Sequence, residues 1–357
     1  MGTSEPARPA VRVRAILDDL PAYRPGRRAP DGTTIKLSSN ESPDAPLPGV
    51  IARAGEALAA ANRYPDNDSS DLAAALASHH GVGTDQVAVG CGSVVLCQQI
   101  VNAVAGPGDE VAYGWRSFEA YPILATLAGA SSVQVPLAAH ALDVDALARQ
   151  VGEATRVVFV CNPNNPTGTA LSGEALFALI DAVPPDCLVV VDEAYREYVT
   201  DRELPDAPAL LAAGPNVAVL RTFSKAYGLA GLRVGYALGS PSVIGALRRT
   251  QVPFGVNVVA QAAALASLEV RDELAARVRA VVAERTRVRA ALLAGGYEVP
   301  DSQANFVWLP LGEDAAAFAA SCAERGVLVR PFPGEGVRVT VGSPAENDAF
   351  LAAVMAP

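Results

Sequence analysis

The sequence predicts an α/β fold, with a large domain built on a mainly parallel seven-stranded sheet and a smaller α+β domain at the C-terminal end. Two observations support this prediction. Short Val-rich runs alternate with longer helix-like segments between about residues 86 and 238. After about residue 240 the pattern changes to a long amphipathic stretch followed by two separate strand-like runs. We expect an N-terminal arm over 1–35, a large domain over 36–245 and a small domain over 246–357.

Seven apolar runs are the predicted strands of the large domain. They are mostly continuous rather than alternating, and Gly, Pro or Asp bounds them, which is typical of strands buried on both faces of a parallel sheet. Helical periodicity between them, as in 94–105 and 172–183, predicts the crossover helices that parallel strands require. The runs are QVAVG (86–90), EVAYG (110–114), SVQVP (132–136), VVFVC (157–161), LVVVDE (188–193), VAVLR (217–221) and VGYALG (234–239).

The small domain is predicted from a different pattern. Residues 271–296 space apolar side chains at helical intervals and end in Gly-Gly, which predicts a long amphipathic helix with a glycine at its C-terminal end. The runs 304–309 and 336–342 are predicted strands, and a helix is expected over 315–326.

Composition excludes several classes of function. The chain has 357 residues, 50% of them hydrophobic and 18% charged, so it can bury a large core without disulfides or a metal. Its 28 basic and 38 acidic residues give a net charge of −10, which argues against a nucleic acid or an anionic membrane as partner. No uncharged run has the character of a bilayer span, and the N-terminal residues lack the apolar core of a signal peptide. The five cysteines form no CxxC pair, so we expect a reducing, cytoplasmic location.

Lys225 is the strongest single candidate for chemistry. It is one of only two lysines among the 28 basic residues, and it follows a predicted strand at the edge where α/β sheets bind ligands. Thr222, Ser224 and Arg233 lie nearby in the sequence and suit a phosphate. A desolvated lysine beside another cation can act as an amine nucleophile. The alternative is a solvated lysine in a polar loop.

Other strand ends carry further polar residues. Asp192 ends a buried strand, where a carboxylate requires a cationic partner unless it caps a helix. The loop CNPNNPTG (161–168) offers asparagine amides, and Gly90-Cys91-Gly92-Ser93 leads into a helix N-terminus that can bind an anion. An aromatic residue within 115–121 could stack on a flat ring or pack in the core. Together these groups fit pyridoxal 5′-phosphate (PLP), a flat, phosphorylated pyridine aldehyde.

The sequence resembles the class I and II aminotransferases of PLP fold type I, in the branch of the histidinol-phosphate and aromatic amino acid aminotransferases. The resemblance covers nearly the whole chain. The segment GWRSFEAYPI (114–123) is most similar to the actinobacterial-type aromatic amino acid (phenylalanine) aminotransferases. The other matching motifs, in order, are LPAYRPG (20–26), SSNESP (38–43), RYPD (63–66), NPNNPTG (162–168), DEAY (192–195), RTFSKAYGLAGLRVGY (221–236), SQANF (302–306) and GVRVTVG (336–342).

The resemblance implies a role for each residue around the cofactor ring. Lys225 would hold the cofactor covalently and move the substrate proton. Asp192 would keep the pyridine nitrogen protonated, and Phe118 would stack on the ring. Asn165 and Tyr195 would hydrogen-bond the ring hydroxyl.

The resemblance also implies a phosphate site and a substrate site. Ser93, Val94, Thr222, Ser224 and Arg233 would hold the phosphate, and Tyr64 would reach it from the neighbouring subunit of a homodimer. Many relatives carry an acidic residue after the position of Ser93, where this chain has Val94 and Val95, so only backbone roles are expected there. Arg338 would bind the substrate α-carboxylate, and Tyr23, Asn305 and Arg330 are further substrate-binding candidates.

The implied reaction is the transfer of the amino group of L-Phe, L-Tyr or L-Trp to 2-oxoglutarate, which gives aromatic 2-oxo acids and L-glutamate. Histidinol phosphate is the alternative donor, and a PLP-dependent decarboxylase or C–S lyase and a non-enzymatic cofactor-binding module are alternatives of other classes. No metal site is expected, because His79, His80 and His140 are the only histidines and the adjacent pair has no third ligand in local spacing. We expect His79 and His80 at a solvated helix end.

Overall fold

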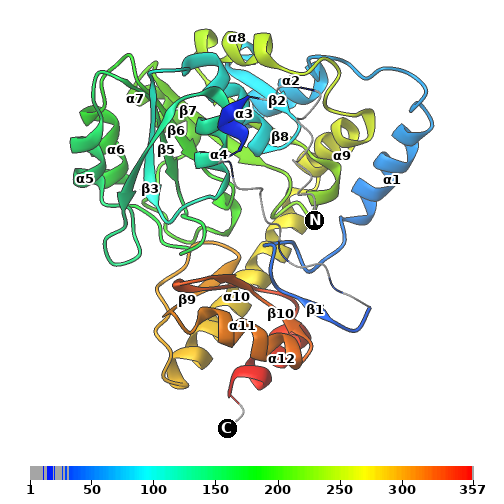
Figure 1. The fold of residues 1–357 in the computed structure, drawn as a ribbon. Coiled ribbons are helices and arrows are strands. Elements are labelled where there is room, and N and C mark those ends of the chain that lie inside the picture. Colours follow the sequence, from blue (N-terminus) through cyan, green and yellow to red (C-terminus); the bar gives the residue numbers. More distant parts are fainter. Residues whose placement is uncertain are drawn as a thin grey trace, which may run out of the picture.

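The computed structural model describes residues 11, 14–18, 20, 26, 29 and 32–355. Figure 1 shows a large sheet flanked by helices in its upper part, and a small sheet with α10, α11 and α12 in its lower part. Short 3-10 helices connect several elements: η1 (Ala15–Leu17), η2 (Thr84–Gln86), η3 (Arg196–Tyr198) and η4 (Ala230–Leu232).

The large sheet has seven strands in the order β2-β8-β7-β6-β5-β3-β4, which confirms the predicted α/β class. It is mainly parallel, and β8 alone among its strands runs antiparallel to its neighbours β2 and β7. The strands are β2 (Val87–Gly90), β3 (Glu110–Trp115), β4 (Ser131–Pro136), β5 (Thr155–Cys161), β6 (Leu188–Asp192), β7 (Val217–Thr222) and β8 (Gly235–Gly239).

Both faces of this sheet are buried, as the continuous apolar runs predict. In β6, Val189 and Val191 belong to one core cluster, whereas Leu188 and Val190 belong to another on the opposite face. The helices α2 (Ser70–His80), α5 (Val144–Gln150), α6 (Gly173–Ala182), α7 (Ala207–Ala213) and α9 (Val258–Glu269) contribute to the first cluster. The second takes side chains from α3 (Ser93–Val104), α4 (Ala120–Ala128) and α8 (Pro241–Thr250).

A second sheet forms in the C-terminal part. Its strands are β9 (Phe306–Gly312), β11 (Arg330–Phe332) and β12 (Glu335–Thr340), in the antiparallel order β11-β12-β9. Around it lie α10 (Arg271–Ala294), α11 (Ala315–Glu324) and α12 (Pro344–Met355). The short strand β1 (Ile35–Lys36) pairs with β10 (Val327–Leu328), far away in the sequence. The helix α1 (Pro48–Leu58) lies against α9.

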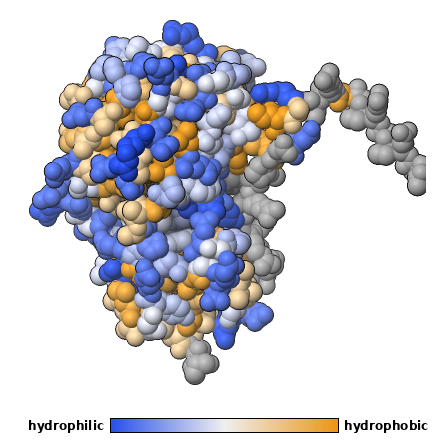
Figure 2. All heavy atoms as spheres, turned by 60° about the vertical axis from the view of Figure 1, so that its left-hand side comes forward, coloured by the Kyte–Doolittle hydropathy of each residue, from blue (hydrophilic) through white to orange (hydrophobic). Residues whose placement is uncertain are grey.

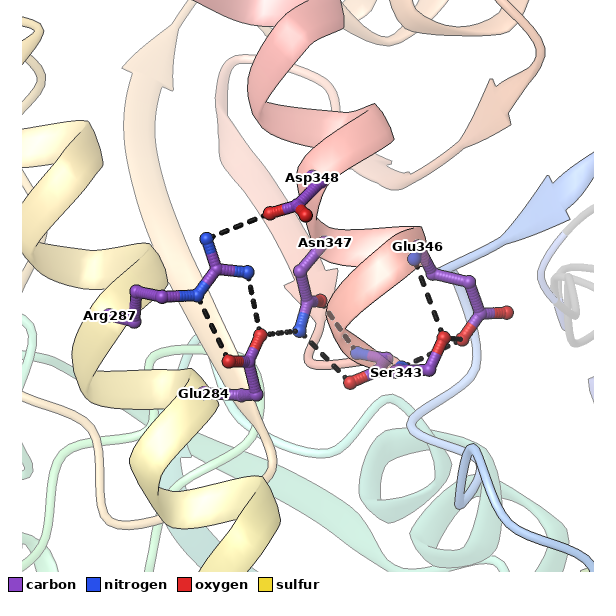
Figure 3. Close-up of polar contacts among 7 residues, drawn as sticks. Glu284, Arg287, Ser343, Glu346, Asn347 and Asp348 are labelled. Carbon is purple, nitrogen blue, oxygen red and sulfur yellow. Dashed lines mark hydrogen bonds and ion pairs between the residues drawn. The ribbon is translucent and has the colours of Figure 1, made fainter.

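The last helix is fixed by a group of polar contacts, shown in Figure 3. Ser343 and Glu346 form a capping box at the start of α12, because the Glu346 carboxylate accepts hydrogen bonds from the Ser343 backbone N–H and hydroxyl at 2.8 Å. Asn347 donates to Glu284 of α10 at 2.8 Å. Arg287 of α10 forms an ion pair with Asp348 at 2.8 Å. These contacts tie α12 to α10.

Figure 2 shows polar and apolar side chains intermixed on one face of the molecule, with patches of apolar side chains on its upper and lower parts. Among the described residues, no helix combines the length and the apolar character needed to cross a membrane.

Candidate active site

A cavity of about 300 Å³ opens where three neighbouring parallel strands end. Cys161, Asp192 and Thr222 are the last residues of β5, β6 and β7, and all three line the cavity. The strand register explains why these ends converge. Cys161 lies opposite Asp192, and Asp192 lies opposite Leu220, two residues before the end of β7. The predicted site residues that line it are Ser93, Val94, Phe118, Asn165, Asp192, Tyr195, Thr222, Ser224, Lys225, Arg233, Arg330 and Arg338.

Lys225 carries the amine of the cavity. Its Nζ donates to the backbone carbonyl of Ser39 at 3.4 Å and lies 5.8 Å from the centre of the Tyr195 ring. Burial, together with the positive charge of Arg338, lowers the pKa of Lys225 to about 8. An appreciable fraction of the amine is therefore neutral near physiological pH, and a neutral amine is the nucleophilic form.

Asp192 presents a carboxylate oxygen that needs a partner. Its Oδ2 accepts a hydrogen bond from the Tyr121 hydroxyl at 2.9 Å. Its Oδ1 is buried, and none of the described residues donates a hydrogen bond to it. Burial raises the pKa of Asp192 to about 6. A buried, uncompensated carboxylate oxygen costs free energy, so the site favours a ligand with a cationic N–H, such as a pyridinium nitrogen.

Tyr121 is a further residue of this site, for which the sequence motifs predict no individual role. It is fully buried and stacks on Phe159 with ring centroids 4.4 Å apart. It also meets the ring of Phe118 edge to face at 5.5 Å. Its spacing of three residues from Phe118 is a signal in the sequence, since the turn that leads into α4 joins the Tyr121 N–H to the Phe118 carbonyl at 3.1 Å and brings the two aromatic residues together.

A cradle for an anion lies at the N-terminus of α3. Gly92, in the left-handed region at φ 83°, precedes Ser93, and a Cβ on Gly92 would come within 2.6 Å of the Arg233 guanidinium. Arg233 donates to the Ser224 hydroxyl at 3.2 Å, and the Ser224 backbone N–H donates to the Thr222 hydroxyl at 3.0 Å. Backbone N–H groups of a helix start, hydroxyls and a guanidinium together form a phosphate site.

Two arginines approach the cavity from the small sheet. Arg330 of β11 lies directly opposite Arg338 of β12 in the strand register. Arg338 donates to Asn165 Oδ1 at 2.5 Å and to the Ser38 carbonyl at 2.9 Å. Arg330 donates to Glu119 at 2.9 Å. Guanidinium groups are well suited to bind carboxylates, so both arginines are candidates for holding the carboxylates of a substrate.

The segment 38–41 lines the cavity on the side of the small sheet. It belongs to the SSNESP motif (38–43), which by itself predicts no role for its individual residues. Asn40 Nδ2 donates to the Tyr195 hydroxyl at 3.0 Å, which fixes that hydroxyl beside the cavity.

Two predicted site residues, Asn305 and Tyr64, do not line the cavity. Asn305 is fully buried and does not line the cavity; its Nδ2 donates to the Asn40 carbonyl at 3.2 Å, so it supports the segment that does. Tyr64 is 83% exposed and stacks on Phe254 at 4.6 Å, away from the cavity. Tyr23 lies outside the described residues.

The histidine pair differs from its expected setting. α2 ends at His80, as predicted, but the His80 ring is partly buried rather than fully solvated, and its Nε2 lies 3.0 Å from the Tyr236 hydroxyl in a hydrogen bond. Burial lowers the pKa of His80 to about 3. In the part of the chain that the structure describes, no three His, Cys, Asp or Glu side chains are grouped so that they could hold a metal ion.

Known proteins match this chain over almost its whole length. Residues 33–354 match the family model described as aminotransferase class I and II. The aromatic amino acid aminotransferase of Thermobifida fusca is 58% identical over 341 residues, 95% of each chain. That of Rhodococcus jostii is 58% identical over 342 residues, 96% of this chain and 94% of the relative. A histidinol-phosphate aminotransferase from Sinorhizobium meliloti, solved with pyridoxal-5′-phosphate, has a TM-score of 0.88 at 30% identity and covers 99% of this chain and 98% of its own.

Proposed function

We propose that this chain, which belongs to the class I and II aminotransferase family, transfers the amino group of aromatic L-amino acids to 2-oxoglutarate. The products would be an aromatic 2-oxo acid and L-glutamate. One observation carries the proposal: Lys225, the buried Asp192 carboxylate and the anion cradle at α3 converge on one cavity that two arginines also reach. The similarity to enzymes named aromatic amino acid aminotransferases supports the choice of donor.

PLP is the cofactor that we infer from the donor set. The unsatisfied Oδ1 of Asp192 suits its pyridinium nitrogen, and the cradle suits its phosphate. When bound, the cofactor supplies an aldehyde for amines and an electron-withdrawing ring. The residues that would hold it are Ser93, Val94, Phe118, Asn165, Asp192, Tyr195, Thr222, Ser224, Lys225 and Arg233.

Three residues of the cavity would have distinct roles in amine transfer: substrate binding, proton transfer and positioning of the cofactor ring. Arg338 would bind the substrate α-carboxylate, since its guanidinium is held at the cavity by Asn165 and Ser38. The Lys225 amine would take the proton from the substrate Cα and deliver it to C4′, the aldehyde carbon of the cofactor, because its lowered pKa lets it exchange protons near neutral pH. Phe118 would bound the ring of the cofactor on one face.

We also infer a homodimer in which Tyr64 reaches the phosphate site of the partner subunit. Tyr64 is 83% exposed and is not part of the cavity of its own subunit. Exposed aromatic residues beside other apolar side chains are typical of an interface.

A donor panel tests the proposed function. Purified enzyme with PLP is given 2-oxoglutarate and, separately, L-Phe, L-Tyr, L-Trp or histidinol phosphate, and glutamate formation is measured. We expect the aromatic donors to give the highest kcat/KM and Lys225→Ala to abolish turnover. A clear preference for histidinol phosphate would replace the proposed donor. Release of CO₂ or a thiol without glutamate would replace the reaction.

A further inference from the structure

We propose that Glu119 determines how one cavity accepts both apolar and dicarboxylate substrates. Its carboxylate would remain the counter-ion of Arg330 when the substrate side chain is an aromatic ring. The Glu119 carboxylate would move away from Arg330 when a dicarboxylate such as 2-oxoglutarate binds that arginine with its own distal carboxylate. This inference rests on the proposed function, since that reaction requires both kinds of side chain to enter the same site in turn.

The ion pair lies at the wall of the cavity. Glu119 Oε2 accepts from Arg330 Nη2 at 2.9 Å, and both residues line the cavity beside Phe118. The Glu119 side chain is 31% exposed and that of Arg330 is 14% exposed. The carboxylate therefore has access to solvent, which can hydrate it when it leaves Arg330, whereas the guanidinium is mostly enclosed and favours an anion beside it.

The strand register explains why an acidic residue is useful at this place. Arg330 and Arg338 lie directly opposite each other on β11 and β12, so their side chains share one face of the small sheet. Two like charges at such positions repel each other. Arg338 donates to neutral oxygens of Asn165 and Ser38 and would receive the α-carboxylate that every substrate carries. The distal end of the substrate varies, and Glu119 supplies a negative charge there when the substrate does not.

A second ion pair provides a matched control. Arg116 and Glu335 connect the same loop before α4 to the same β11–β12 hairpin, with Arg116 Nε 2.9 Å from the Glu335 carboxylate. Neither residue lines the cavity. Glu335→Gln therefore removes a comparable interdomain charge contact without altering the substrate site.

The test is a binding experiment with two unreactive acids on the PLP-loaded enzyme. Glutarate imitates 2-oxoglutarate, and 3-phenylpropanoate imitates an aromatic substrate; dissociation constants are measured by titration calorimetry. We expect Glu119→Gln to shift the affinity ratio toward glutarate by about tenfold, because the competing carboxylate is gone and an apolar ring now faces a guanidinium that has lost the Glu119 charge. Glu335→Gln should change the ratio less than about twofold.

An Arg330→Gln background separates a specific role of Glu119 from a structural one. If Glu119 acts through Arg330, adding Glu119→Gln to Arg330→Gln should leave the ratio unchanged. A ratio that does not move in the single variant, or that moves toward 3-phenylpropanoate, overturns the proposal. So does an effect that persists without Arg330. Because the two acids do not react, this outcome is independent of the donor panel, which alone decides the proposed function.

Discussion

At the scale of single residues, Asp192 shows how a functional group lowers the stability of the fold that holds it. Its folded pKa, raised to about 6 by burial, exceeds the ordinary value of a carboxyl. Between about pH 4 and pH 6 the folded chain therefore binds more protons than the unfolded chain, and the stability of the cofactor-free protein decreases as pH rises through this window.

The decrease in stability with rising pH leads to a prediction for Asp192→Asn. The neutral amide avoids the buried charge, so the cofactor-free variant should be more stable than the wild type by about 1–3 kcal/mol at pH 8. The gain should shrink toward zero as pH approaches 4. Urea denaturation of both proteins at several pH values measures it. A variant that is no more stable at pH 8 would show that the Asp192 carboxylate is already compensated in the folded state.

Lys225 allows a direct measurement of its amine. Burial and Arg338 lower its pKa to about 8, so in the cofactor-free protein its reactivity toward acetic anhydride should rise with a midpoint near pH 8. Peptide mass mapping is simple, because Lys36 is the only other lysine and its peptide gives a reference for reagent exposure. Arg338→Gln removes a nearby positive charge and should move the midpoint upward. A midpoint at the ordinary lysine value of about 10.4 would contradict the desolvated setting.

At the scale of secondary-structure elements, the Asn347 side chain makes three hydrogen bonds, to Gly342 and Glu284. It is buried, its Oδ1 accepts from the Gly342 N–H at 2.9 Å, and its Nδ2 donates to the Gly342 carbonyl at 2.9 Å and to Glu284. It thus closes the turn before α12 and connects that helix to α10 (Figure 3).

Asn347→Ala should therefore lower the free energy of unfolding by about 1–3 kcal/mol, because backbone groups of Gly342 lose their partner in a buried place. Asp348→Ala, next along the same helix, removes an ion pair whose carboxylate side chain is 66% exposed and should cost less than about 1 kcal/mol. Urea denaturation of the wild type and both variants measures the loss in free energy of unfolding that each substitution causes. Equal losses would mean that the contacts of Asn347 are replaced by water.

The sequence was most informative where a structural property is local. Continuous Val-rich runs such as 188–191 reveal strands buried on both faces, because burial on both sides leaves no polar position. The strand ends also predicted that Lys225 and Asp192 would meet at one edge of the sheet, since parallel strands share that edge.

Features that depend on distant residues were not predictable. Nothing in the composition of β8 marks it as antiparallel, and β1 pairs with β10 across almost the whole chain. The contact between Tyr121 and Asp192 joins α4 to β6, and no local pattern records it. The SQANF motif predicts Asn305 as a substrate-binding candidate, but in the fold its amide donates to the Asn40 carbonyl, and it is the Asn40 amide that reaches the Tyr195 hydroxyl.

At the scale of the whole molecule, exposed apolar side chains lie on α1 and on two further segments, one at Tyr64 and one at residues 252–254. Tyr64 stacks on Phe254, and the Phe254 backbone N–H donates to Asn67 at 2.9 Å. A surface of this kind is typical of contact between subunits. The exposed large apolar residues of these parts of the chain are Ile51 and Leu58 on α1, and Tyr64, Val252 and Phe254 in the two segments that the ring stack joins.

If Tyr64 completes the phosphate site of the partner subunit, two defective chains should restore each other. Tyr64→Ala should weaken PLP retention by about tenfold, the loss of one hydrogen bond to a charged group, and Lys225→Ala should be inactive. In a mixed dimer, the Tyr64→Ala subunit keeps its Lys225 and receives Tyr64 from the Lys225→Ala subunit. One of the two active sites of the dimer is therefore complete, and the other lacks both residues. Co-expression with different tags isolates this species, and its activity at limiting PLP should approach half that of the wild type. Activity no higher than that of the Tyr64→Ala homodimer, or a monomer in sedimentation equilibrium, would place Tyr64 outside the site.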